Sequence, residues 1–176
     1  MLEQEDYDQF PGWVGGLFAA NGSFYITRSG ETVAGRTRYL LCAAVRIHVS
    51  RKELVQDLID LLGGRLILKK KGYYNRVTWE VRTVKGTTKI VELLDQVVWP
   101  MPTIINRQHD IARRWLAHKL LPGRPTDDEL ANDVQFFREQ LYDEMRELTE
   151  YKRSLEFKRK EEIEDGEDVE GAVGGT

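Results

Sequence analysis

A helix-like run of small residues that ends abruptly in a strand constrains the fold of this chain more than any other feature. The small residues recur at spacings that place them along one side of a helix: Gly12, Gly15, Gly16 and Ala19. Glycine inside a helix costs roughly 0.5–1 kcal/mol relative to alanine, so the pattern predicts that another backbone approaches this side closely. The helical pattern stops at Gly22, and the alternation in Ser23–Ile26 predicts a strand directly after it.

Charge is distributed unevenly along the 176 residues, although the formal net charge is only −3. Residues 35–91 contain thirteen Lys and Arg against four Asp and Glu, whereas residues 161–176 contain seven acids and no base. The body is therefore basic and suits a polyanionic partner, and the tail is acidic.

Composition narrows the class of protein further. The apolar runs are too short to span a bilayer, and the acidic, polar first residues do not resemble a secretory signal. The single cysteine, Cys42, is expected to be a buried small residue, and His48, His109 and His118 lack the spacing of zinc ligands. We expect an intracellular protein, in the cytoplasm or nucleoid or in a eukaryotic organelle, without a membrane partner.

Periodicity and turn residues predict the order α-β-β-α-β-β-α with appended helices. The predicted elements are a helix over Pro11–Ala20, strands over 23–28 and 39–49, a helix over 50–64, strands over 65–70 and 77–84, a helix from about Thr88, a helix over 106–120 and a helix from about Thr126. Capping boxes are predicted at Ser50–Glu53 and Thr126–Glu129. We expect an N-terminal arm (1–10), a single α+β domain (11–160) and a disordered acidic tail (161–176).

These features resemble the LAGLIDADG homing endonucleases. Gly15–Phe18 is similar to the middle of the signature helix of that family, and Asn21–Ile26 is similar to its exit into the first strand. The resemblance extends from about Gly12 to Leu148 and implies the αββαββα fold, whose antiparallel strands form a saddle on duplex DNA. A single signature implies a homodimer, with Gly12, Gly15, Gly16 and Ala19 at the interface of two signature helices.

The chain departs from the family pattern at its catalytic positions. The metal-binding acid of the family falls on Asn21, a second frequent acid falls on Ala19, and the usual basic residue falls on Ile105. A neutral amide binds a hard divalent cation weakly, and isoleucine cannot stabilise developing charge. We therefore expect a degenerate active site, in which the candidate metal ligands are Asn21 and the backbone oxygen of Ala20, and Mg²⁺ is the cofactor if the enzyme is active.

Strand alternation predicts which residues face the DNA. The candidates are polar or basic residues on the faces opposite the core: Ser23, Tyr25, Thr27, Arg36, Arg38, Arg46, His48, Lys69, Lys70, Lys71, Arg76, Thr78 and Arg82. Gln108 and Asp110 are expected to be ordinary helix-surface residues.

Three functions remain open at this point. The first is a sequence-specific double-stranded DNA-binding protein whose cleavage activity is impaired or lost. The second is an active metal-dependent homing endonuclease, and the third is an RNA-binding splicing helper, a role that members of the family have acquired. A purely structural interaction protein fits the basic strands least well.

Overall fold

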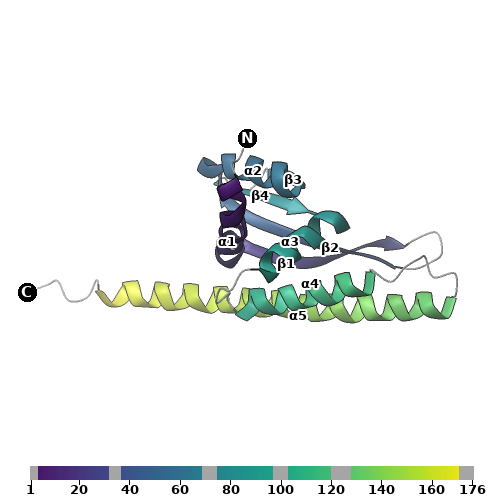
Figure 1. Cartoon of the computed structure of the whole chain (residues 1–176). Coiled ribbons are helices and arrows are strands. Elements are labelled where there is room, and N and C mark those ends of the chain that lie inside the picture. Colours follow the sequence, from purple (N-terminus) through teal and green to yellow (C-terminus); the bar gives the residue numbers. More distant parts are fainter. Residues whose placement is uncertain (1–3, 32–36, 69–74, 97–102, 120–127, 171–176) are drawn as a thin grey trace, which may run out of the picture.

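The computed structural model describes residues 4–31, 37–68, 75–96, 103–119 and 128–170, which form an antiparallel sheet with packed helices (Figure 1). Its elements are α1 (Gln4–Asn21), β1 (Gly22–Glu31), β2 (Thr37–His48), the 3-10 turn η1 (Val49–Arg51), α2 (Glu53–Leu62), β3 (Arg65–Leu68), β4 (Arg76–Val81), α3 (Val84–Asp95), α4 (Thr103–Lys119) and α5 (Asp128–Glu170). The predicted α+β class and the αββαββα order are confirmed. No helix in the described part of the chain has the length and apolar character needed to cross a membrane.

The four strands lie in the order β1-β2-β4-β3, and every neighbouring pair is antiparallel. Tyr25 of β1 is opposite Cys42 of β2. Arg46 of β2 is opposite Thr78 of β4. Because directly opposed residues point to the same face of a sheet, this register fixes which side chains lie together.

One face of the sheet carries the hydrophobic core, against which α1 and α3 pack. Phe24, Val45 and Trp79 come from three different strands and are fully buried there. Phe18 of α1 joins them, with its ring centroid 5.5 Å from that of Phe24 and 6.4 Å from that of Trp79. The inward-facing side chains of the strands and the apolar side of α1 therefore form one core, as the sequence predicts.

Gly22 forms the junction between α1 and β1 and tolerates no side chain. A Cβ atom at this position would lie 2.6 Å from the Cα atom of Phe18. The chain turns back against the last turn of α1 so closely that only glycine fits. The sequence prediction of an abrupt change from helix to strand at Gly22 is confirmed.

The structure corrects two of the predicted boundaries. The first helix begins at Gln4 rather than near Pro11, so residues 4–10 are helical instead of forming a separate arm. Proline in a helix removes one backbone hydrogen bond without necessarily ending the helix. Strand β4 ends at Val81 rather than Val84, because Thr83 accepts a hydrogen bond from the Gly86 N–H and starts α3.

The capping box at Ser50 was also wrong. Ser50 lies in η1, where its N–H donates to the side chain of His48, and α2 has Lys52 at its N-cap without a side-chain bond. Gly63 and Gly64 do end α2, with positive φ angles of 74° and 100°. Residues 126–127, which belong to the second predicted capping box, lie outside the described residues.

Helix α5 continues to Glu170, so residues 161–170 are helical rather than disordered as predicted. Acidic composition alone suggested disorder, but the helix propagates through this segment, because Glu is a good helix former and no proline interrupts it. Residues 171–176 lie outside the described residues.

Candidate nucleic-acid interface

The face of the sheet opposite the core carries most of the residues that the sequence predicts to contact DNA. We call it the open face, and its polar and charged residues, as strand register places them, are Ser23, Tyr25, Thr27, Arg38, Arg46, His48, Arg65, Arg76, Thr78 and Glu80. Arg82, directly after β4, joins them through its hydrogen bond to Glu80. The predicted alternation is confirmed, since Phe24 and Ile26 are buried in the core while Ser23, Tyr25 and Thr27 point the other way. Arg36 and Lys69, Lys70 and Lys71, which were also predicted, lie outside the described residues.

Exposed basic side chains lie in two neighbouring cross-strand pairs of the open face. Arg46 is opposite Thr78, and His48 is opposite Arg76 on the same pair of strands. Arg46, His48 and Arg76 are all exposed to solvent. His48 Nδ1 lies 2.7 Å from the hydroxyl oxygen of Ser50, which orients its ring. Four side chains from β2 and β4 thus form a compact polar surface.

A buried carboxylate lies at the centre of the open face, and sequence analysis did not predict it. Glu80 is only 3% exposed. Its Oε2 accepts from Arg65 Nη2 at 2.9 Å and from Arg82 Nε at 2.7 Å. The Tyr25 hydroxyl donates to Oε1 of the same carboxylate. We call these four residues the Glu80 cluster.

Contacts within the Glu80 cluster shift the pKa values of Glu80, Arg82 and Tyr25. Burial opposes ionisation of Glu80, but hydrogen bonds from Arg82, Tyr25 and Arg65 hold its pKa below the usual value. The bond to Glu80 raises the pKa of Arg82. Burial, together with the bond to Glu80, raises the pKa of Tyr25. The cluster is therefore ionic at neutral pH, and Arg82 is already paired within the protein instead of being free for a DNA contact.

One sequence signal could have revealed this cluster. Thr78, Glu80 and Arg82 alternate along β4 and its extension, so they share a face. An acidic residue between two predicted DNA contacts is unexpected on a basic surface, and its basic partners could have been sought on the neighbouring strands. Arg65 is opposite Glu80 only because β3 pairs with β4 in this register, and nothing local in the sequence gives that register.

The helix that leads into β1 presents the positions aligned with a metal site. Asn21 is the last residue of α1 and is exposed, as is Ala20, while Ala19 is half-buried. Among the described residues, no three His, Cys, Asp or Glu side chains gather closely enough to hold a metal ion. Asn21 places a neutral amide oxygen at this position, whereas a hard divalent cation prefers charged oxygens.

Helix α4 supports the start of β1 from the core side. Gln108 is 2% exposed, and its Oε1 accepts from the Phe24 N–H at 3.2 Å. The ring of His109 stacks on Phe24 at 6.0 Å, and its Nε2 lies 3.3 Å from the Val91 carbonyl oxygen. Burial lowers the pKa of His109. The prediction that Gln108 is a surface residue was wrong, because periodicity shows which helix face is apolar but not which polar group bonds an edge strand.

Solved structures of homing endonucleases share this architecture. The homing endonuclease I-TnaI is 20% identical, with a TM-score of 0.57 over 78% of this chain and 97% of that one. The archaeal intron-encoded homing endonuclease I-Vdi141I, solved with DNA, is 19% identical, with a TM-score of 0.58 over 80% of this chain and 86% of that one. The LAGLIDADG homing endonuclease I-GzeII, solved with its DNA target, is 14% identical, with a TM-score of 0.54 over 73% of this chain but only 43% of that one.

The fold is that of the LAGLIDADG homing endonucleases. No protein-family model matches the sequence, and no curated protein resembles it closely enough to count as a relative. The likeness is therefore one of structure.

Ile105 occupies the position that the resemblance aligned with the basic residue of the LAGLIDADG site. It is 4% exposed and belongs to the hydrophobic core. A lysine in its place would have to bury a charge among apolar side chains, which is unfavourable without a partner. Arg107, two residues further along α4, is exposed. A single substitution at position 105 therefore cannot supply an accessible basic group.

Proposed function

We propose that this protein binds specific sites on double-stranded DNA through its open face and that it descends from a homing endonuclease whose cleavage activity is impaired or lost. The observation that carries the proposal is that one face of the sheet presents the exposed basic side chains Arg38, Arg46, His48 and Arg76. Strands present such side chains to the major groove, where arginine can read guanine. Structural likeness to I-Vdi141I and I-GzeII, both solved with DNA, supports the same partner.

Loss of cleavage rests on the chemistry of two positions. Asn21 offers a neutral amide where charge is needed to hold Mg²⁺. Ile105 is packed in the core and offers no basic group. The competing proposal of an active endonuclease requires metal to be held by water and backbone oxygens near Ala20.

The proposal includes a homodimer in which the α1 helices of two copies pack together. A Cβ atom added at Gly12 or Gly16 would meet no atom within 4 Å, so the glycines are not required by packing within one subunit. Close approach of a second helix is a reason for their presence. Gly15 is buried and Ala19 half-buried on the same helix.

Selection of binding sites from random duplex DNA, with Mg²⁺ or Mn²⁺ present, tests binding and cleavage together. We expect an enriched duplex motif and no cleavage at that motif. Arg46→Ala should lower affinity for the selected site by roughly 1–3 kcal/mol and relax the preference at one base pair. Lys89→Ala removes an equal charge from α3, on the opposite side of the sheet, and serves as the matched control. Tight binding of structured RNA without a duplex motif would instead support a splicing helper.

Two further variants test the dimer and the metal position. Gly16→Leu should give a monomer by light scattering. Gly30→Leu should leave the dimer intact, since a Cβ atom at position 30 also meets no atom within 4 Å and the residue lies at the end of β1, away from α1. Asn21→Asp should restore Mg²⁺ or Mn²⁺ binding by calorimetry, because it replaces a neutral oxygen with a carboxylate. Cleavage by the unmodified chain would contradict the proposed loss of activity.

A further inference from the structure

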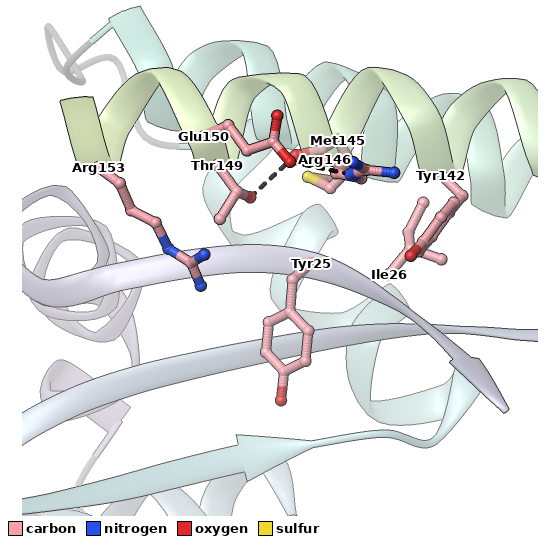
Figure 2. Close-up of a pocket in the computed structure, with 8 residues that line it drawn as sticks. All are labelled: Tyr25, Ile26, Tyr142, Met145, Arg146, Thr149, Glu150 and Arg153. Carbon is pink, nitrogen blue, oxygen red and sulfur yellow. Dashed lines mark hydrogen bonds and ion pairs between the residues drawn. The ribbon is translucent and has the colours of Figure 1, made fainter. Parts of the chain in front are cut away.

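Helix α5 is much longer than the part of it that packs on the rest of the protein. Residues of α5 as far as Arg153 line a cavity of about 250 Å³ against Tyr25 and Ile26 of β1. Figure 2 shows the side chain of Arg153 directed from α5 toward β1. Beyond this point the helix continues to Glu170 and projects past α1 (Figure 1). Tyr151 and Leu155, where the projection starts, are 55% and 42% exposed.

The direction of α5 relative to β1 shows where the projection leads. Near the far end of β1, Tyr39, which pairs with Arg28, contacts Glu139 through its hydroxyl at 3.3 Å. Near the start of β1, Tyr25 lies beside residues 146–153. Helix α5 therefore runs antiparallel to β1 and toward Gly22, where α1 ends.

The rise per residue of strands and helices shows which residue of α5 lies level with the end of α1. A strand advances about 3.3 Å per residue and a helix about 1.5 Å. From Arg28 back to Gly22 the strand covers about 20 Å, which corresponds to roughly thirteen helical residues. Counted from Glu139, which lies beside the Tyr39–Arg28 pair, the level of Gly22 is reached near Lys152. The rest of α5, as far as Glu170, extends beyond that level.

The charge of the projecting helix changes sign after Lys160. Its first part contains the bases Lys152, Arg153, Lys158, Arg159 and Lys160, with one acid at Glu156. Its second part contains the acids Glu161, Glu162, Glu164, Asp165, Glu167, Asp168 and Glu170, with no base. Such a helix is complementary to a second copy of itself in the antiparallel orientation, because the basic part of each copy meets the acidic part of the other.

We propose that the projecting parts of α5 from two copies of this chain pair antiparallel and cross near Lys160, so that each α5 reaches across the dimer. This inference rests on the homodimer of the proposed function, since the projecting part of α5 starts at the level where α1 ends. In that register Lys158 lies level with Glu162 of the second copy and Arg159 with its Glu161. Lys152 lies level with its Asp168. Tyr151 and Leu155 are apolar groups that the second helix would shield.

Mixing two oppositely charged variants of the full chain tests this pairing. The acidic variant carries Lys158→Glu with Arg159→Glu, and the basic variant carries Glu161→Lys with Glu162→Lys. Within either variant alone, like charges would face each other at the crossing, and the dissociation constant of its dimer should rise about tenfold at low salt. A mixture restores opposite charges between copies, so mixed dimers should exceed the statistical half when the variants carry different fluorophores.

Mixing distinguishes contacts between copies from effects within one helix. An ion pair that a variant loses within its own helix stays lost, whichever copy that variant pairs with. The control mixture combines Arg146→Glu with Glu150→Arg, two changes on the part of α5 that packs on the body, and should give the statistical half. A statistical mixture of the crossing variants, with wild type dimeric and Gly16→Leu monomeric, would overturn the α5 pairing and leave the dimer of the proposed function standing. A monomeric wild type would overturn both.

Discussion

Replacing Glu80 with glutamine should make the protein less stable and at the same time improve its non-specific binding to DNA. The carboxylate accepts from Arg65, Arg82 and Tyr25 on the open face. Glutamine keeps the volume and one acceptor oxygen but loses the charge, and its amide group meets guanidinium donors. The variant therefore separates the structural role of the Glu80 cluster from its electrostatic effect on a polyanion.

The size of the expected stability loss depends on how exposed the two arginine side chains are. Hydrogen bonds to charged groups contribute roughly 1.5–3 kcal/mol each when buried, but the Arg65 and Arg82 side chains are 57% and 44% exposed. Solvent screening lowers each of these ion pairs to about 0–1 kcal/mol. With the bond from the half-buried Tyr25, the expected loss is about 1–3 kcal/mol, measured as the free energy of unfolding in urea at neutral pH.

The dependence of this stability loss on pH tests the direction of the pKa shift of Glu80. The folded-state pKa of Glu80 is lowered, so its stabilisation is present above the unfolded pKa of a glutamate and disappears as pH falls through the folded value. The stability difference between wild type and Glu80→Gln should therefore shrink in acid. Glu150→Gln, which changes an exposed pair with Arg146, is the matched control and should leave the denaturation midpoint unchanged. A difference that persists unchanged in acid would refute the reasoning.

DNA binding should change in the opposite direction. The substitution removes one negative charge from the open face and frees two arginines for phosphates. Each additional phosphate contact steepens the dependence of log affinity on log salt by about 0.9, so the slope should steepen by roughly 1–2. Weaker binding together with a shallower slope would show that the Glu80 cluster presents Arg65 and Arg82 to DNA in their paired state.

Three other outcomes follow from single features of the fold. Gly22→Ala should lower the free energy of unfolding by about 1–3 kcal/mol, because its Cβ atom would lie 2.6 Å from the α1 backbone. Gly30→Ala, where a Cβ atom meets no atom within 4 Å, should leave it unchanged. Equal melting temperatures for the two variants would contradict the tight junction. Gln108→Leu should lower the free energy of unfolding by about 1–3 kcal/mol by leaving the Phe24 N–H without its acceptor, and hydrogen exchange at that amide should speed up. Removing residues 161–176 should tighten non-specific DNA binding at low salt, since seven acids compete with phosphates; unchanged affinity in a titration would limit this segment to other roles.

The amino-acid sequence by itself determined the features that repeat locally. Alternation along β1 and β2 separates Phe24 from Tyr25 and Val45 from Arg46, because successive side chains of a strand point to opposite faces. The glycines at 22, 63 and 64 mark the ends of α1 and α2, since they occupy positions where a side chain clashes or φ is positive. These signals depend only on neighbours in the chain, and together they gave the order of elements and the LAGLIDADG resemblance.

Only the tertiary structure decided which distant residues meet. Arg65 reaches Glu80 through the β3–β4 register, and Gln108 reaches the Phe24 N–H across the core. The same packing buries Ile105, so the position that the resemblance matches with a basic residue is part of the core. Such contacts depend on the relative placement of whole elements, and that placement is set by the free energy of packing them together rather than by any pattern within one segment.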